Sequence, residues 1–513
     1  MKRTFLQAIG LATVLAAALA VPAWQSASAA PVFNAKSFGA RCNGTGDDYP
    51  ALQRAEQAAF RAGGGTVYIP AGSCRVSSGI AMDSNVSLKG AGAHTTTLVA
   101  TPDFGFGGRT VRRGENGRFI GMVWLDGPSQ TGPLHNVLIS DIGFDPRAGT
   151  QKYDIASKGT YNCITANILP LQHITFQNLY FNLGANAVYP SGNRTEGNGP
   201  KGFFGIELPV LGVDPDNPSY DLKFENIEGR NGNGTIQLAL GGFTNSRGVT
   251  STAHDIYING VHDVIDTNNV ADDRTVVDGV TNPAPGKLGQ MYNFTIENID
   301  VDVKDNVTTG SINGVHINPA TNTIIHNVLI ENIKFHGSPN GHYGAPLPSA
   351  RSLNASGAPF AIHANQLNGF VRNVTIRNIN AVNSGAIFLG LGAESGQVTN
   401  TVVDNVQLLN CLDYSAAIVV QVSGNSTGSD RVIIRNFHAT AAPQAAAAGG
   451  HPSGLYFSAL PGKGVSGNVV IQNGLLEGYT KPLVVRPGFD GMQLEGVRWT
   501  TGQAQVESRV TIH

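Results

Sequence analysis

Apolar and polar residues alternate along this chain in a short motif that recurs ten times. The motif reads apolar-x-apolar-x-Asn-apolar, as in Val328 to Ile333, and this alternation is the period of a β-strand with one buried face. The Asn position holds Asn178, Asn226, Asn298, Asn332, Asn378, Asn405, Asn436 and Asn473, with Asp141 and Gly260 in two variants. Because Asn tolerates the left-handed backbone region, the motif predicts a strand that ends in a bend.

The spacing of the motif predicts the fold. Successive copies lie 27 to 48 residues apart, within or near the repeat range of solenoid proteins. Between copies, a variable Gly-rich loop precedes a second alternating strand, as in Gly205 to Leu208, Gly314 to Ile317 and Ala361 to Ala364. A single coil cannot bury its apolar face, so neighbouring coils must stack. We predict an all-β fold, a right-handed parallel β-helix with three strands per coil and ten or more coils.

Composition and charge agree with one elongated domain. Glycine provides 64 of 513 residues, only 14% of residues are charged, and no long amphipathic pattern follows residue 65. Bends, rather than the helices of ordinary parallel sheets, therefore connect the strands. We expect residues 30–92 to form an N-terminal cap and the first coils, continuous with the β-helix over residues 93–513. A net charge of −2 without a basic run argues against nucleic acid as a partner.

Residues 1–29 have the pattern of a secretory signal peptide. A charged start at Met1 to Arg3 precedes an apolar run from Phe5 to Val21 and a small-residue cleavage site at Ala27 to Ala29. The pattern predicts a secreted or periplasmic protein that keeps no membrane segment after cleavage.

The four cysteines fit export. Cys42 and Cys74 flank the expected cap, where a disulfide between them is possible, and Cys163 and Cys411 are expected to be buried thiols. The spacing of the four residues fits no zinc site.

The N-terminal region carries the most specific motifs. Phe38-Gly-Ala40 leads to Gly44-Thr-Gly-Asp-Asp48, a short helical pattern follows, and Gly63 to Gly72 and Asn85 to Gly92 complete the set. This arrangement resembles the N-terminus of the pectate-lyase-like β-helix superfamily, in the branch with rhamnogalacturonase, polygalacturonase-like and epimerase-like proteins. We expect Asp47 or Asp48 to cap the helix and the helix to cover the open end of the solenoid.

The resemblance implies action on a polysaccharide. It also implies that the Asn bend lies opposite the substrate groove, and that the groove lies on the face of the strand that follows the variable loop. On that face, strand alternation places one outward side chain per coil. The predicted outward row is Glu207, Gln237, Asp278, His316, His363 and Phe388, with Asn318 and Asn365 at the next outward positions. The predicted walls are the loops at 183–202, 209–219, 262–275, 280–290 and 337–358.

Two reactions fit this row. For hydrolysis, Glu207 and Asp278 would lie about 9.6 Å apart along the stack. An inverting pair of carboxyl groups is held about 6.5 to 9.5 Å apart, so their side chains would fit that role, with His316 orienting a carboxylate or the substrate. Asp272 and Asp273 provide a second possible pair, in the loop before Asp278.

For a lyase, His316 or His363 would abstract the proton beside a uronate carboxylate. Arg274, Arg351 or a Ca²⁺ ion would neutralise that carboxylate. We predict a secreted glycoside hydrolase acting on a pectin-like or other acidic glycan, without a metal or other cofactor. A polysaccharide lyase or uronate epimerase is the alternative, with Ca²⁺ if it is a lyase. A third hypothesis is a non-catalytic carbohydrate-binding or surface protein, in which the row is a solvated polar stripe.

Overall fold

The computed structural model describes most of the chain between residues 30 and 512. The described ranges are 30–105, 118–127, 131–146, 159–166, 169–184, 203–232, 234–267, 270–279, 286–307, 310–319, 321–339, 357–364, 368–391, 396–412, 416–422, 430–443, 453–459, 468–489, 491–507 and 510–512. The predicted signal peptide, Arg351 and Asn365 lie outside these ranges. Within them, no helix is long and apolar enough to span a membrane.

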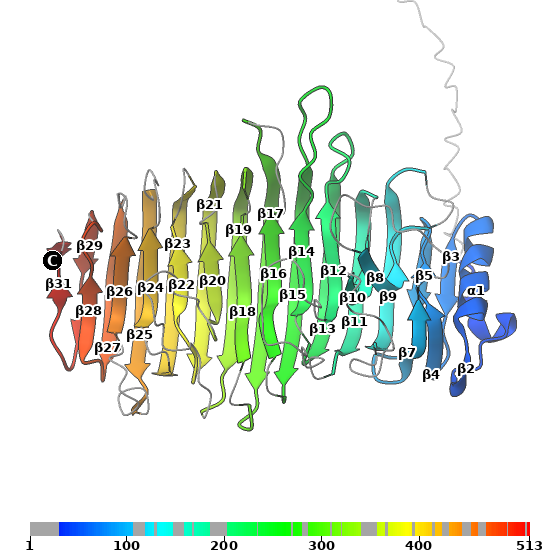
Figure 1. The fold of residues 1–513 in the computed structure, drawn as a ribbon, viewed down its shortest axis with the longest axis horizontal. Helices are drawn as coiled ribbons and strands as arrows, with labels where there is room; N and C mark the ends of the chain where they lie inside the picture. The colour runs from blue at the N-terminus through cyan, green and yellow to red at the C-terminus, as the bar shows by residue number, and fades with distance from the viewer. Residues whose placement is uncertain are drawn as a thin grey trace, which may run out of the picture.

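The strands wind into a parallel β-helix whose coils stack along one long axis (Figure 1). Sheet A contains nineteen strands: β1 Val32–Asn34, β2 Asn43–Asp47, β3 Gly65–Tyr68, β4 Gly72–Ser78, β6 Val86–Lys89, β7 Thr96–Gly105, β9 Leu134–Asp145, β11 Leu171–Asn182, β13 Ser219–Arg230, β15 Thr252–Ile265, β17 Gly289–Val303, β19 Thr323–His336, β21 Gly369–Val382, β23 Gln397–Cys411, β25 Asp430–Ala441, β27 Val469–Glu477, β29 Met492–Glu495, β30 Arg498–Trp499 and β32 Val510–Ile512. The prediction of an all-β parallel β-helix is confirmed.

Sheet B contains the thirteen shorter strands that alternate with those of sheet A along the chain. They are β5 Ile80–Ala81, β8 Arg118–Trp124, β10 Gly159–Thr165, β12 Phe203–Leu211, β14 Gly234–Leu240, β16 Val270–Gly279, β18 Gly310–Asn318, β20 Phe360–His363, β22 Ile387–Gly390, β24 Ala416–Val422, β26 Ser453–Ala459, β28 Lys481–Val485 and β31 Gln505–Val506. Sheet B is the face on which the sequence predicts the site.

The Asn bends lie within the long strands of sheet A. In β17, burial alternates until Asn298, where two outward residues follow one another, and alternation then resumes at Ile299. Asn298 has a φ of 58°, in the left-handed region, and the other nine residues of this row also have positive φ. The predicted bend is confirmed. The structure adds a second bend five residues earlier, at Asn293 in β17, with a φ of 57°.

The side chains at the predicted bend form a hydrogen-bonded ladder, which we call the bend row. The amide of Asn332 donates to Oδ1 of Asn298 at 3.1 Å and accepts from the amide of Asn378 at 3.0 Å. Asn405 continues the row with a 2.9 Å bond to Asn378. Each of these amides therefore ties its coil to the preceding one.

One apolar core fills the solenoid from Ala35 to Leu494, across the boundary expected near residue 92. Equivalent inward positions in neighbouring coils stack directly, as with Phe176 and Phe224, whose ring centroids lie 4.9 Å apart. The cap region and the coils therefore share a continuous core.

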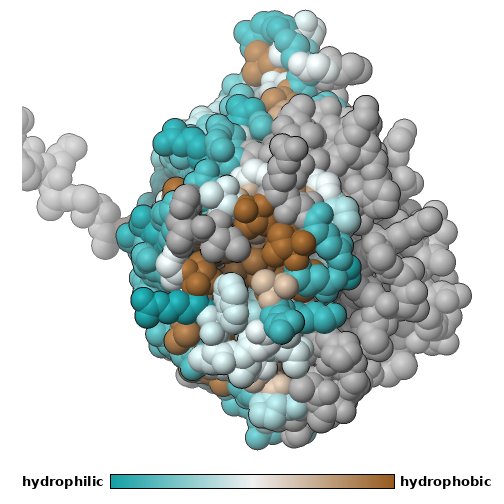
Figure 2. Space-filling model, turned by 90° about the vertical axis from the view of Figure 1, so that its left-hand side faces the viewer, coloured by the Kyte–Doolittle hydropathy of each residue, from teal (hydrophilic) through white to brown (hydrophobic). Residues whose placement is uncertain are grey.

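The two ends of the solenoid differ. Helix α1 (Tyr49–Arg61) and the short 3-10 helix η1 (Ala35–Phe38) lie at the N-terminal end (Figure 1), where Oδ1 of Asp47 accepts a 3.1 Å hydrogen bond from the Tyr49 N–H. At the opposite end, hydrophobic residues are visible at the centre of the surface (Figure 2). Val506 of β31 is 40% exposed there.

Candidate functional site

Sheet B fixes which outward side chains lie side by side. Its register aligns Glu207, Gln237, Val276, His316, Ala361 and Phe388 on successive strands from β12 to β22. We call this set the first site row. Four of its six residues were predicted, whereas Val276 and Ala361 hold the positions predicted for Asp278 and His363.

Asp278 and His363 lie two residues further along their strands, in a second site row. Asp278 aligns with Asn318, and His363 directly follows Ile362, the partner of Ile317. The predicted single row was therefore wrong at these two positions. A shift of two residues keeps a side chain on the same face, so strand alternation alone cannot detect it.

This register weakens the predicted carboxylate pair. Glu207 and Asp278 are separated by two strand spacings and by two residues along the strand, so their backbones lie about 12 Å apart. This backbone separation is longer than the separation of about 9.6 Å expected for two residues of one row. Asp272 and Asp273 lie on β16, opposite Ile312 and Asn313, and not in a preceding loop. The side chains of these three aspartates lie outside the described part of the structure.

Arg274 was predicted to contact the substrate, and this prediction was wrong. Its side chain is completely buried and pairs at 3.0 Å with Asp263, which is also completely buried. The same guanidinium donates to the carbonyl oxygens of Asn231 and Gly232 at 2.8 and 3.1 Å. Arg274 therefore ties β16 to the preceding coils from inside the molecule.

Three aromatic rings bring the two site rows together. The rings of His316 and His363 meet edge to face with centroids 4.4 Å apart, and the ring of Phe388 meets His363 in the same way at 4.6 Å. His363 thus lies between a second imidazole and an apolar ring. We call these three residues the imidazole cluster.

The predicted open groove is more enclosed than expected. Although they point outward by strand alternation, Glu207 is only 6% exposed and His316 only 8% exposed, whereas His363 is partly exposed. Phe388 packs in a small apolar cluster that is separate from the main core. This cluster consists of Ala358, Ala361, Ala386, Phe388, Ala416 and Val419. This cluster was not predicted from the sequence, although four of its six residues are alanines. Burial removes water from around the imidazoles and strengthens their electrostatic interactions.

The predicted wall loops are shorter than expected around 262–275, because β15 continues to Ile265 and β16 begins at Val270. The 209–219 segment includes the end of β12 and a described loop before β13. The longest stretches, 185–202 and 340–356, lie outside the described residues.

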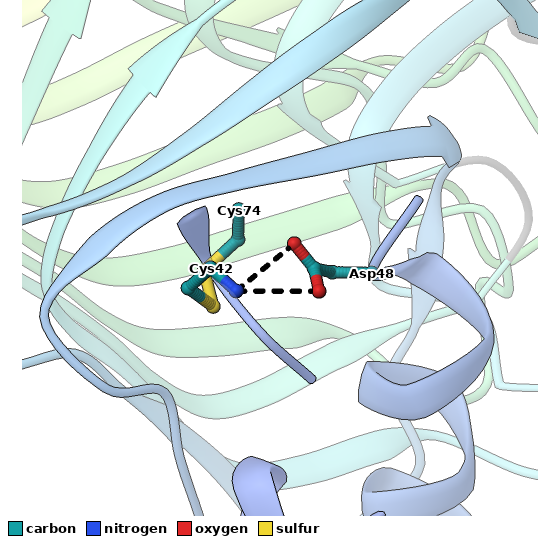
Figure 3. A group of neighbouring side chains, drawn as sticks. All are labelled: Cys42, Asp48 and Cys74. Carbon is teal, nitrogen blue, oxygen red and sulfur yellow. Dashed lines mark hydrogen bonds between the residues drawn. A yellow bond between two sulfur atoms is a disulfide. The ribbon is translucent and has the colours of Figure 1, made fainter. Parts of the chain in front are cut away.

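Across the described ranges, one group of three potential metal ligands comes close together: Cys42, Asp48 and Cys74 (Figure 3). The two sulfur atoms form a disulfide, which confirms that pairing, and both oxygens of Asp48 accept from the Cys42 N–H, at 3.3 and 3.2 Å. With both sulfurs bonded, this group is a structural element of the N-terminal end and offers no thiolate to a metal.

The two remaining cysteines, Cys163 and Cys411, are buried thiols, as predicted. Burial, and then the charge of Asp145, raise the pKa of Cys163 well above its ordinary value.

The N-terminal sequence of this chain is similar to that of pectate-lyase-like proteins, and its fold is a parallel β-helix. Residues 32–117 match the family described as rhamnogalacturonase A/epimerase, pectate lyase-like, which confirms the resemblance predicted from residues 33–92.

The chain is similar in sequence to two named enzymes. The chain is 36% identical to the mannuronan C5-epimerase AlgE3 of Azotobacter vinelandii over 160 residues, which is 24% of this chain and 9% of the epimerase. It is 45% identical to alginate lyase 7 of the same organism over 73 residues, or 13% and 8% of the two chains. The chain thus matches about a tenth of the length of these relatives.

Two solved structures are similar to this chain over most of its length. The A-module of the mannuronan C5-epimerase AlgE4 of Azotobacter vinelandii covers 94% of this chain and 98% of its own, with 13% identity and a TM-score of 0.38. An exopolygalacturonase from Thermotoga maritima covers 92% of both chains, with 13% identity and a TM-score of 0.42. At these scores, neither comparison bears on activity.

Proposed function

We propose that this protein acts on a uronate-containing polysaccharide by removing the proton at C5, as a C5-epimerase or a lyase. The observation that carries the proposal is the imidazole cluster, which holds two potential bases in contact on the predicted substrate face. The sequence relatives are epimerases and an alginate lyase, which favours this alternative over the predicted hydrolase.

Both reactions begin with the same step. One neutral imidazole takes the proton from C5, and the electrons of the C–H bond pass into the adjacent carboxyl group. An epimerase then returns a proton to the opposite face of C5. A lyase instead breaks the C4–O bond, forms a C4=C5 double bond and protonates the leaving oxygen. General bases of this kind accelerate reactions about 10²- to 10⁴-fold.

The pair of histidines suits this step because the two rings cannot both be charged without repulsion. In the proposed arrangement, neutral His316 or His363 is the base, and the other imidazole, when protonated, donates to the substrate carboxylate. The protonated imidazole takes the role that was predicted for Arg274, whose guanidinium is buried away from the substrate face. Because two titrating groups share the site, the pH profile of activity would report the pair and neither ring alone.

The test is to incubate the protein with polymannuronate in D₂O. If the protein is an epimerase, we expect deuterium at C5 of the polymer, detected by mass spectrometry after acid hydrolysis, and an altered sugar ratio without cleavage. If it is a lyase, C5 becomes part of the new double bond and carries no deuterium, and we expect an unsaturated product that absorbs in the ultraviolet. New reducing ends with neither deuterium nor an unsaturated product would restore the hydrolase, and binding without any product would favour the non-catalytic hypothesis. The same incubation with and without a chelator decides whether Ca²⁺ takes part.

A further inference from the structure

An aromatic side chain is exposed on a rigid loop beside the substrate face. Residues 241–251, which we call the β14 loop, leave sheet B at the end of β14, four residues after Gln237. Phe243 in this loop is 42% exposed, although most large apolar side chains of the described chain are buried. Val249 in the same loop is 43% exposed, so two of the four exposed large hydrophobic side chains of the described residues lie on this one loop, which points to a binding role.

The β14 loop is held in one shape by its own hydrogen bonds. The Phe243 N–H donates to Oγ of Ser251 at 2.9 Å, and the Ser251 N–H donates back to the Phe243 carbonyl at 3.0 Å. The Asn245 side chain accepts from the N–H groups of Arg247 and Val249 at 3.0 and 2.9 Å. Arg247 also pairs with Asp216 in the loop after β12, so residues of two consecutive coils hold the β14 loop in place. Two loops rise from the solenoid beside β12 and β14 (Figure 1).

Glycine at position 241 explains how the Phe243 ring lies. A Cβ atom at Gly241 would come within 2.7 Å of Cε2 and 2.9 Å of Cδ2 of the Phe243 ring. The ring therefore packs against the bare backbone at Gly241, while 42% of the side chain remains exposed to solvent. The face of an aromatic ring has negative potential and attracts the positively polarised C–H groups of a sugar ring.

A basic side chain lies near the tip of the same loop. Nζ of Lys287 is 3.3 Å from the position that a Cβ would take at Gly248, and the Leu288 carbonyl accepts a 2.7 Å bond from Thr250. Lys287 is exposed, so its ammonium group can meet a carboxylate from solvent. An exposed aromatic ring in the β14 loop and a cation beside Gly248 of the same loop fit a sugar that carries a carboxylate.

We propose that Phe243 and Lys287 form an outer subsite for one acidic sugar unit of a polysaccharide, away from the reacting unit. The six Cα-to-Cα steps from Gln237 to Phe243 span at most about 20 Å, so the subsite lies within a few sugar units of the site rows. This proposal rests on the proposed function for the class of polymer, but it concerns binding and needs no chemistry.

The test measures binding of polymannuronate, and of a neutral glucomannan, by affinity electrophoresis. Phe243→Ala should weaken binding of polymannuronate about 3- to 10-fold, and Phe243→Tyr should retain it. Gly241→Ala should weaken binding by displacing the ring without removing it. Lys287→Gln should weaken binding of the acidic polymer more than of the neutral one. Val506→Ala, an exposed apolar change at the far end, is the matched control and should leave binding unchanged.

The outcomes separate this proposal from the proposed function. Unchanged binding in Phe243→Ala, or no binding of either polymer by the wild type, overturns the subsite. Deuterium at C5 or an unsaturated product, together with unchanged binding in Phe243→Ala, leaves the proposed function in place and removes the subsite. Weakened binding in Phe243→Ala, with neither deuterium nor an unsaturated product formed by the wild type, supports the subsite and overturns the proposed function.

Discussion

The bend row on sheet A and the first site row on sheet B both place one residue per coil along the same stack, yet they differ in every other respect. The bend row repeats Asn in eight of ten coils, with the same left-handed backbone and the same amide ladder. The first site row changes residue type at each coil, from Glu207 to Phe388. Repetition therefore marks the positions that hold the coil together, and variation marks the positions available for chemistry.

The same contrast explains what could be predicted from the sequence. The bend row has its own signal at each copy, so Asn298 and Asn332 needed no knowledge of neighbouring coils. The site rows depend on register between strands, which loops of different lengths set. Val276 and Asp278 are two residues apart on β16, so strand alternation assigns them to the same face, and only the hydrogen-bonded register shows which of them pairs with Gln237.

Other errors have equally local causes. The sequence around Arg274 does not show that its side chain pairs with the buried Asp263 of the preceding sheet A strand, so Arg274 was predicted to bind substrate. The left-handed residues five positions before the bend row form a second bend row. It was not predicted because several of its positions hold other residues, such as His173, Asp221 and Arg431, so Asn does not recur there regularly. The disulfide was open to prediction only as a possibility, because Cys42 and Cys74 flank the expected cap region but are 32 residues apart. The residue at the start of α1 is Asp48, which makes no side-chain cap bond to the helix, whereas Asp47 accepts from the Tyr49 N–H.

The largest expected effect comes from the site rows. His316→Gln should lower the rate of proton removal from C5 about 10²- to 10⁴-fold, measured as deuterium incorporation for an epimerase or as unsaturated product for a lyase, because it removes a base or its charged partner. The melting temperature should change little, since His316 lies outside the main core. Asp278→Asn is the paired variant, and a large loss there with full activity in His316→Gln would point back to a carboxylate mechanism.

Arg274→Met tests whether a variable position on β16 can be structural. Removing the guanidinium leaves the completely buried Asp263 carboxylate without its partner, which should cost about 3 to 5 kcal/mol of unfolding free energy. The double variant Arg274→Met with Asp263→Leu should recover part of that loss, as measured by chemical denaturation. Equal stability of the single variant and the wild type would contradict the structural role.

Asn332→Val tests the bend row. A β-branched residue at a φ of 59° is strained and cannot make the two ladder bonds, so we expect a loss of about 1 to 3 kcal/mol. Asn332→Gly separates the two causes, because glycine removes the bonds without the strain, as Gly260 does naturally. Lys334→Ala, an exposed change two residues away, should cost under about 0.5 kcal/mol. Similar melting temperatures for Asn332→Val and Lys334→Ala would remove the ladder from the explanation of the fold.

The smallest expected effect is a pH dependence in the second bend row. Hydrogen bonds, first from His173 and then from Lys223, hold the pKa of Asp221 below its ordinary value. A carboxyl group with a lowered folded pKa stabilises the protein above its unfolded pKa of about 3.9, and this contribution is lost as pH falls through the folded pKa. Because Asp221 is partly exposed, the contribution should stay under about 1 kcal/mol.

Asp221→Asn should therefore lower the melting temperature slightly at pH 6 and flatten its fall between about pH 5 and pH 3. Lys223→Met removes only one partner of the carboxylate and should flatten the curve less. The measurement is a set of thermal melts at fixed ionic strength across this range. Parallel curves for the wild type and Asp221→Asn would show that this aspartate acts at the bend only through its backbone conformation, which is the role that asparagine has in the row beside it.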